Sequence, residues 1–503
     1  MGSTGGTSPG TGGGAAGTTG SAGTTGSAGT TGSAGATGAA ATTGAAGTTG
    51  GAATTGAAGT TGGAATTGAA GTTGAAGGPS ASCTFTTSSS VSTKIPTVGI
   101  VTWSTTMPGV QSARIDFGLT TSYGMTSPVD LTQPSYRTLL LGMKASRMYH
   151  FRITATSGSG DCQGPDNTIM TGPLANGLVK PTVMTQNPAA LSGGFLLTGQ
   201  YVQNASGNGP AYILDADGDY VWWYMIEDYV VSVVMDYAGT HMWINNHPPN
   251  IAESKTHRVT MDGLMDEDLS ASLPKLSHQI AVMPDETIAF YASDGGPEGC
   301  DYIKERAPNG TVKTIANSQR ALGTTGNCHV NNIQYSKWDN TLVFSDHVHQ
   351  AVAKIRRSDG GTVWIMNNAT KTLTGDTWRG SQHGIHILGV DDFIIFNNNT
   401  RLIAGSTEPG GTGDGSGALE VKLDLTAKTV TKIWSYKATG NTYQTDVMGD
   451  IQRMPNGNHV IAFGGKGVIQ EINPSGTVVQ ELRTQTNFGY IQKRATLYGP
   501  PPR

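Results

Sequence analysis

The most regular pattern in the chain is a hairpin that recurs from about residue 180 onward. Each copy has a strand of mixed apolar and polar residues, a tight turn that contains glycine, and a second strand that often ends in an aromatic residue. The Asp-Gly and Asn-Pro-Ser-Gly turn centres supply the positive φ values that hairpin turns require. Copies cover residues 211–224, 302–313, 352–364, 419–434 and 468–479, with a weaker copy at 256–263.

A second hairpin type lies between the copies of the first, at residues 278–290, 329–344, 383–396 and 449–463. Two hairpins make a four-stranded blade, and six such units fit between residues 180 and 503. No helical periodicity competes with this pattern. The sequence therefore predicts an all-β fold in which residues 180–503 form a six-bladed β-propeller.

Residues 83–175 show a different spacing of short strands. Segments rich in β-branched and aromatic residues alternate with turn residues at the interval of a β-sandwich. Alternation places Tyr149, Phe151 and Ile153 on one face of a strand. Together with Trp103, this strand predicts a small fibronectin type III-like sandwich that serves in spacing or docking. The expected strands cover residues 98–103, 112–117, 138–141 and 148–155.

Residues 1–82 contain no charged residue and no histidine, and repeat small residues such as Thr-Thr-Gly-Ser-Ala-Gly. Such side chains bury too little surface to offset the entropy of ordering the backbone, so we predict a disordered, extended spacer. A stalk of this composition is typical of exported or surface-tethered proteins. The first residues lack the basic start and apolar segment of a signal peptide, so we expect any envelope tether to lie upstream of the spacer.

Charge and cysteines narrow the surroundings of the folded part. The formal net charge is −4 and no long basic run is present, so nucleic acid is not an expected partner. No apolar stretch reaches the length of a membrane-spanning helix. Cys83 and Cys162 bracket the smaller domain, whereas Cys300 and Cys328 lie in neighbouring loops of the larger one. This even division predicts two disulfides and a periplasmic or extracellular location, and four buried free thiols are the alternative.

Histidines recur at one phase of the repeat. His278, His329 and His383 each open the first strand of the second hairpin type, 51 and 54 residues apart, and the next copy has Gly449 there. Because the innermost strands of all blades run beside the central axis, residues at one phase form a ring around one mouth of the channel. A single histidine at a strand start is usually structural, but three at one phase indicate a shared functional site.

Other histidines fit the ring less well. His347 and His349 alternate after an outgoing strand, and either one enters the pocket or both belong to a loop. His386 lies on the opposite face of its strand from His383 and is expected to pack between blades. We assign no role to four histidines in turns or outer strands, which are His241, His247, His257 and His459.

Two chemistries suit a ring of three imidazoles. Neutral imidazoles can bind a metal and leave a fourth position for water. Alternatively, one imidazole acts as a nucleophile while the others donate hydrogen bonds to an anionic group undergoing transfer. Spacing alone leaves both open.

Several runs in the larger domain resemble the bacterial arylsulfotransferases, and the chain is similar to a divergent member of that family. They include Cys-His-Val-Asn-Asn at 328–332, Ser-Gln-His at 381–383, Gly-Asp-Ile-Gln-Arg-Met-Pro-Asn-Gly-Asn at 449–458, and the closing segment 490–498. The resemblance covers most of residues 200–500. It implies a six-bladed propeller after a small β domain, and transfer of a sulfuryl group from an aryl sulfate to a phenol without a cofactor or a metal.

The resemblance also implies roles for particular residues. His383 matches the nucleophile of a ping-pong reaction through a sulfohistidine, and His329 and His278 match histidines that hold the sulfuryl oxygens. Asn331 is expected to be a further donor to the substrate. The family usually has arginine where this chain has Ser-Asp-His at 345–347. His347 therefore takes a weaker, titratable place in substrate binding.

The missing arginine leaves a charge to be supplied from elsewhere. Arg379, Arg401 and Arg494 are the candidates, and we include Arg494 among the expected substrate-binding residues. His383 is followed by Gly384, where an acidic residue is common in the family. The competing hypotheses are a metal-dependent hydrolase or lyase that uses the three histidines, and a surface propeller that binds glycans or proteins without catalysis.

Overall fold

The computed structural model describes residues 83–202, 207–246, 248, 250–293, 300–366, 371–376, 378, 380–400, 412–438 and 440–500. The predicted spacer, residues 1–82, lies outside the described residues. The described part is nearly all β, as predicted, with one short α-helix, α5 (Ser318–Leu322). None of the helices in it is long and apolar enough to cross a membrane. Short 3₁₀ turns are η4 (Pro134–Tyr136), η5 (Pro188–Ala190), η6 (Ile251–Glu253), η7 (Asn441–Tyr443) and η8 (Gly464–Lys466).

Residues 83–175 form two antiparallel sheets around a buried apolar interior. Tyr149, Phe151 and Ile153 are buried in that interior together with Trp103, as the alternation predicted. The disulfide Cys83–Cys162 joins the start of this region to its β7 strand. One sheet has the order β1-β2-β5 and the other the order β4-β3-β6-β7, with β8 also on β6. The strands are β1 (Phe85–Val91), β2 (Gly99–Thr105), β3 (Val110–Gly118), β4 (Met125–Pro128), β5 (Thr138–Leu140), β6 (Met148–Ser157), β7 (Gly160–Gln163) and β8 (Asn167–Met170).

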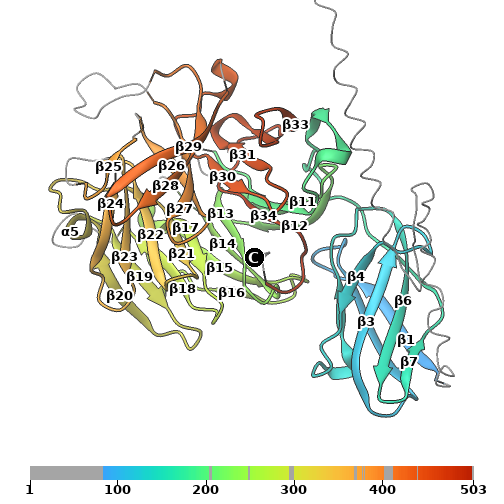
Figure 1. Cartoon of the computed structure of the whole chain (residues 1–503). Helices are drawn as coiled ribbons and strands as arrows, with labels where there is room; N and C mark the ends of the chain where they lie inside the picture. Colours follow the sequence, from blue (N-terminus) through green and yellow to red (C-terminus); the bar gives the residue numbers. More distant parts are fainter. Residues whose placement is uncertain are drawn as a thin grey trace, which may run out of the picture. The chain divides into compact units, whose positions relative to one another are not determined.

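From residue 182 onward the described chain forms six sheets of four or five strands (Figure 1). Every hairpin predicted from the sequence is present as an antiparallel pair within one of these sheets. The first three sheets contain β34 (Gln492–Arg494), β10 (Phe195–Gly199), β11 (Gly209–Leu214) and β12 (Tyr220–Ile226); β13 (Val230–Met235), β14 (His241–Asn246), β15 (Thr256–Thr260) and β16 (Asp266–Asp268); and β17 (Leu276–Val282), β18 (Ile288–Ala292), β19 (Tyr302–Arg306) and β20 (Val312–Asn317).

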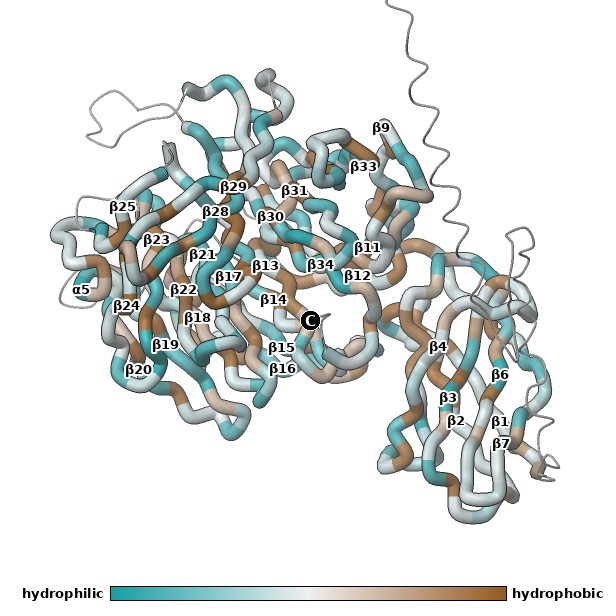
Figure 2. Tube along the Cα trace, in the orientation of Figure 1, coloured by the Kyte–Doolittle hydropathy of each residue, from teal (hydrophilic) through white to brown (hydrophobic). Residues whose placement is uncertain are grey.

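The other three sheets follow the same order of strands. They contain β21 (Val330–Ser336), β22 (Thr341–Asp346), β23 (Ala351–Arg356) and β24 (Thr362–Met366); β26 (Gln382–Ile387), β27 (Asp392–Asn397), β28 (Gly417–Asp424), β29 (Thr429–Lys437) and β25 (Thr374–Gly375); and β30 (Asp450–Arg453), β31 (His459–Phe463), β32 (Val468–Ile472), β33 (Val478–Arg483) and β9 (Thr182–Gln186). Figure 2 shows apolar and polar residues mixed along these strands, and the outer strand β16, with the sequence Asp-Glu-Asp, is hydrophilic.

The two ends of this region are exchanged between sheets. The last strand, β34, pairs antiparallel with β10 of the first sheet, so that Phe195 lies opposite Arg494. The first strand, β9, pairs with β33 of the last sheet, where Gln186 lies opposite Gln480. Both ends are therefore held by strands about 300 residues away in sequence, which closes the succession of sheets on itself.

Hydrogen bonds join the innermost strands of several neighbouring sheets. Asn332 Nδ2 of β21 donates to Gln279 Oε1 of β17, and Gly384 N of β26 donates to Gly449 O at 3.0 Å, just before β30. Gln452 of β30 exchanges two hydrogen bonds of 2.8 Å with the backbone of Lys493 on β34. These strands also line one shared cavity, which places β13, β17, β21, β26, β30 and β34 around a common axis.

Candidate functional site

The predicted histidines lie at the starts of three successive inner strands. His278 is on β17, His329 directly precedes β21, and His383 is on β26. The His278 and His329 rings are 5.0 Å apart between centroids, and their Nε2 atoms are 3.4 Å apart. His278 and His383 are buried, whereas His329 is exposed, so the group reaches from the surface into the interior.

His347 completes a row of four imidazoles. Its ring centroid lies 5.7 Å from that of His329 and 5.7 Å from that of His383. Burial lowers the pKa of His347, although the neighbouring Asp346 carboxylate works in the opposite direction. The loop after β22 therefore places a mostly neutral imidazole in the position that the resemblance assigned to an arginine.

The orientation of the His383 ring is fixed by Asn398, which follows β27. His383 Nδ1 lies 2.6 Å from Asn398 Oδ1. Asn398 Nδ2 already donates to the carbonyls of Thr445 and Met448, each at 2.9 Å, so Oδ1 must be the acceptor. The hydrogen of the neutral ring is therefore on Nδ1, and Nε2 keeps its lone pair.

The pKa of His383 is lowered to about 3, mainly because the ring is buried. The nearby His347 and His329 lower this pKa further, and the hydrogen bond to Asn398 raises it. At neutral pH His383 is consequently uncharged. A buried, neutral imidazole with a free Nε2 can act as a nucleophile.

Tyr490, just before β34, lies between the two ends of the histidine row. Its ring centroid is 6.2 Å from that of His278 and 6.3 Å from that of His383. Its hydroxyl donates to the carbonyl of Asn331 at 2.7 Å, and burial raises its pKa well above the ordinary value. Sequence reasoning did not identify Tyr490 as a site residue. Its phase was the available signal, because it precedes β34 as Gly449 precedes β30.

The other two predicted binding residues have structural contacts. Asn331 is fully buried and its Nδ2 donates to the carbonyl of Gln382 at 3.0 Å, so it holds the strand that carries His383. The structure does not bring Arg494 into the histidine group. Its guanidinium donates to the carbonyls of Thr496 and Gly499, and burial lowers its pKa to about 10. Arg379 and Arg401 lie outside the described residues.

A carboxylate and a disulfide hold the loop that carries His329. Asp346 accepts a hydrogen bond from the His329 backbone N–H at 2.9 Å and contacts His349 Nδ1 at 2.9 Å. The neighbouring Cys328 is bonded to Cys300. Both predicted disulfides are thus confirmed, and the only exposed histidine of the four has a covalently anchored loop beside it.

The glycine after His383 leaves room for an acid from the next sheet. A Cβ on Gly384 would overlap the carboxylate of Asp450 and would lie 2.6 Å from its Cα. Asp450 accepts from the backbone N–H groups of Ile451 at 2.9 Å and Ile491 at 3.1 Å. Burial outweighs these bonds and raises the pKa of Asp450 to about 7. Asp450 of β30 therefore occupies the space beside Gly384, a contact that sequence reasoning missed.

Metal-ligating groups gather elsewhere. Among the described residues, sets of three such side chains with close ligand atoms occur in two places, and neither includes His278, His329 or His383. One set is Asp215, Asp217 and Asp219, whose carboxylates surround the Lys144 ammonium at 2.7–3.1 Å. The other includes Cys328, whose sulfur is committed to the disulfide and is not a thiolate ligand.

The remaining histidines have local partners. His386 Nδ1 accepts a hydrogen bond from the Arg453 backbone N–H at 3.0 Å, and burial lowers its pKa to about 4. His257 pairs with Asp266 and His241 with Asp236. His459 stacks on Trp434 with 3.9 Å between ring centroids. His247 lies outside the described residues.

Comparisons with known proteins give the following matches. The family described as "Arylsulfotransferase (ASST)" matches residues 180–495. No curated protein matches the chain. Similar solved structures include a protein of unknown function from Bacteroides caccae, with 15% identity over 59% of this chain and 98% of that chain and a TM-score of 0.38. A streptogramin B lyase has 14% identity over 61% and 88% of the two chains, with a TM-score of 0.37. The β-propeller domain of Cps50 (Swd1) from Myceliophteria thermophila has 8% identity over 62% and 89%, with a TM-score of 0.37.

Proposed function

The chain belongs to the arylsulfotransferase family, and from this membership we propose that it moves a sulfuryl group from an aryl sulfate to a phenol through a sulfohistidine at His383. The observation that carries the proposal is the bond from His383 Nδ1 to Asn398, which leaves Nε2 free within a row of imidazoles. No cofactor is required, because the donor itself supplies the group that is transferred.

The same proposal includes the architecture. Residues 83–175 would be a fibronectin type III-like domain, and residues 180–503 a six-bladed β-propeller in which each sheet is one blade. The exchange of β9 and β34 between the first and last sheets supports a closed ring. The hydrogen bonds from one inner strand to the next support it as well. Propeller closure of this kind fixes the spacing of residues at one phase.

In the first step His383 Nε2 attacks the sulfur of the aryl sulfate. An N–S bond forms, the S–O bond to the aryl group breaks, and its electron pair leaves with the phenolate. The imidazole ring then carries positive charge, which the hydrogen bond from Nδ1 to Asn398 Oδ1 offsets. The buried position of His383 keeps this ring neutral before attack, and so available as a nucleophile, at ordinary pH.

The His278–His329 pair protonates the departing phenolate and deprotonates the attacking phenol. With their Nε2 atoms 3.4 Å apart, one ring donates to the other, so the pair can hold one proton and release it. It gives the proton to the phenolate of the donor and recovers one from the hydroxyl of the acceptor. The acceptor oxygen then attacks sulfur, the N–S bond breaks, and its electrons return to His383 Nε2.

His347 and Tyr490 complete the site in this scheme. His347 lies between His329 and His383, so it is placed to donate to an oxygen of the sulfuryl group during transfer. Tyr490 is held by the Asn331 carbonyl and forms an aromatic floor beside His278 and His383. The two disulfides are consistent with a periplasmic or extracellular protein, and we propose secretion on that basis.

The test combines turnover with detection of the intermediate. The protein is mixed with para-nitrophenyl sulfate, with and without phenol, and nitrophenolate release is followed by absorbance. We expect phenol-dependent release that persists in a chelator and disappears in His383→Ala. The matched control is His257→Ala, because His257 lies on β15 and pairs with Asp266.

A second measurement identifies the covalent step. Incubation with the donor alone should add the mass of one SO3 group to a peptide that contains His383, and subsequent phenol should remove it. Turnover without this adduct, or turnover that His383→Ala retains, would contradict the sulfohistidine. Activity lost on chelation would favour the metal-dependent alternative.

A further inference from the structure

The channel contains a cavity beyond the histidines. Its volume is about 360 Å³ and residues of all six inner strands line it. Two of the lining residues directly follow site residues, Gln279 after His278 and Ile491 after Tyr490. None of the four site histidines contributes to it, and the buried Tyr490 and Asp450 lie at the boundary. The cavity is thus a space of its own, next to the proposed reaction site.

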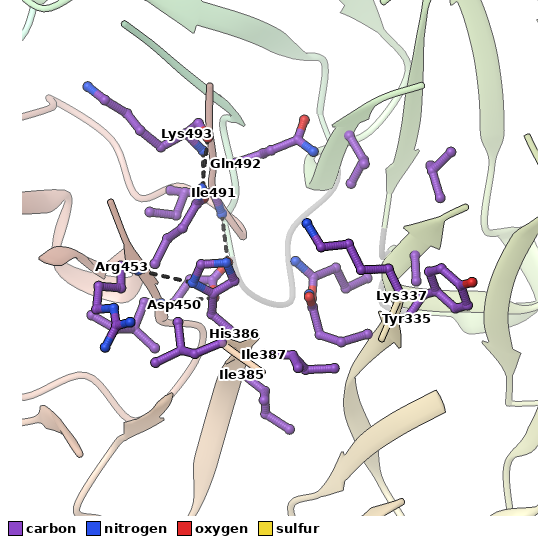
Figure 3. A pocket seen from close by; sticks show the side chains of 18 of the residues that line it. Tyr335, Lys337, Ile385, His386, Ile387, Asp450, Arg453, Ile491, Gln492 and Lys493 are labelled. Carbon is purple, nitrogen blue, oxygen red and sulfur yellow. Dashed lines mark hydrogen bonds between the residues drawn. The ribbon is translucent and has the colours of Figure 1, made fainter. Parts of the chain in front are cut away.

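Part of the cavity wall is made of apolar, branched residues. Ile385 and Ile387 on β26, Ile451 on β30 and Ile491 before β34 belong to the lining, and Figure 3 labels three of them, Ile385, Ile387 and Ile491. Trp338 and Tyr335 add aromatic surface on the β21 side. A volume of this size suits a molecule of one or two aromatic rings, since small-molecule pockets begin at about 300 Å³. The wall therefore favours a flat apolar body.

The polar groups of the cavity favour an anion. The Lys337 side chain points across the cavity toward the side that carries His386 and Asp450 (Figure 3). Its ammonium lies 5.0 Å from the centroid of the Trp338 ring, and no carboxylate within the described ranges pairs with it. By contrast, the guanidinium of Arg453 is already bonded to Glu420 at 2.7 Å.

His386 supplies a second donor. Because its Nδ1 accepts from the Arg453 backbone N–H, the hydrogen of the neutral ring must be on Nε2. The one acid in the lining of the described cavity, Asp450, has both oxygens engaged by backbone N–H groups. Lys337 and His386 thus offer the cavity an ammonium and an N–H group, which recognise a negative charge.

We propose that this cavity is a second binding site that takes an aromatic anion, with its ring against the apolar and aromatic part of the lining and its acidic group on Lys337 and His386. An aryl sulfonate is a suitable probe, because its sulfur is bound to carbon and it offers no aryl ester bond for transfer. The site does not depend on sulfotransfer at His383, so each can fail without the other.

The test is a fluorescence titration with anilinonaphthalene sulfonate, repeated in competition with non-fluorescent naphthalene sulfonate. We expect saturable binding of one probe per chain. Lys337→Ala should weaken it about tenfold, because a hydrogen bond to a charged group is lost. Lys432→Ala, an exposed lysine on the outer strand β29, is the matched control and should bind as wild type.

A second variant fills the space. Ile387→Trp should abolish binding, while its circular dichroism and unfolding temperature show that it folds. Binding that both Lys337→Ala and Ile387→Trp retain would overturn the proposal, as would several weak sites without competition. Loss of binding in His383→Ala with retention in Lys337→Ala would place the sulfonate at the histidines instead.

Discussion

Replacement of Asn398 tests whether the His383 ring must be oriented for transfer. In Asn398→Ala the Nδ1–H of His383 loses its acceptor at 2.6 Å, and the ring is free to turn or change tautomer. The bond gains strength when the ring becomes cationic in the sulfohistidine, and hydrogen bonds to charged groups contribute about 1.5–3 kcal/mol. At about 1.4 kcal/mol per factor of ten, the first half-reaction should slow by roughly 10- to 100-fold.

The assay is the burst of nitrophenolate from para-nitrophenyl sulfate without an acceptor, measured in rapid mixing. We expect the rate of the burst to fall while the donor concentration for half-saturation changes little, because Asn398 does not touch the substrate. A merely structural role would not produce that separation of kcat from KM.

The control must match the structural loss. Asn398→Ala also removes donors from the carbonyls of Thr445 and Met448. Asn458 is likewise buried, and its Nδ2 bonds to the Ala190 carbonyl at 2.7 Å and to Glu471 at 2.6 Å. Asn458→Ala should lower stability similarly and leave the burst intact. If the two variants have equal burst rates, the orienting role of Asn398 is refuted.

Three further changes test the surroundings of the site. The pKa of Asp450 is about 7 in the folded protein against 3.8 ordinarily, so between these values the folded state keeps a proton on Asp450 that the unfolded state has lost. The free energy of unfolding should therefore fall as pH rises from about 4 to 7. Urea unfolding curves of Asp450→Asn should show a flatter pH dependence. The double variant Cys300→Ser/Cys328→Ser opens a loop of sequence separation 28 and should lower the unfolding free energy by about 3 kcal/mol. It should also slow sulfuryl transfer, because the loop that carries His329 is less firmly held. An unchanged denaturation midpoint would contradict the anchoring role. Gly384→Ala should destabilise the protein by about 1–3 kcal/mol and reduce turnover, because its methyl group overlaps Asp450. Wild-type stability and wild-type turnover would show that β26 and β30 can move apart without cost.

Local chemistry explains why the sheets could be predicted. Each hairpin has its own turn signal, such as the Asp-Gly centre between β11 and β12, and needs no information from distant residues. The exchange of β9 and β34 has no such signal, because it depends on pairing between strands at opposite ends of the domain. Nothing in the pattern of either strand indicates its partner.

The residues of the candidate site also divide into those that the sequence could predict and those that it could not. His278, His329 and His383 could be grouped because one residue type recurs at one phase. Tyr490 shares that phase, but a tyrosine before a strand is common in cores. Asn398 contacts His383 within the fifth sheet, and Asp450 approaches Gly384 from the sixth; only the packed structure shows these contacts. The arginine expected for charge, Arg494, instead donates from Nε and Nη2 to carbonyls near its own strand.

The backbone at His278 adds an independent reason to regard the histidine row as functional. Its φ is 54°, in the left-handed region, although the residue is not glycine and its side chain is buried. Such a conformation costs on the order of 1 kcal/mol and persists where its surroundings enforce it. Here Asn245 Nδ2 holds the His278 carbonyl at 2.7 Å, and Ser277 Oγ contacts Nδ1 at 2.6 Å. At the corresponding place in the sixth sheet the chain has Gly449, with a φ of 128° and no side chain. Glycine would meet the backbone requirement at 278 without strain, and the presence of an imidazole there supports the role proposed for His278 beside His329.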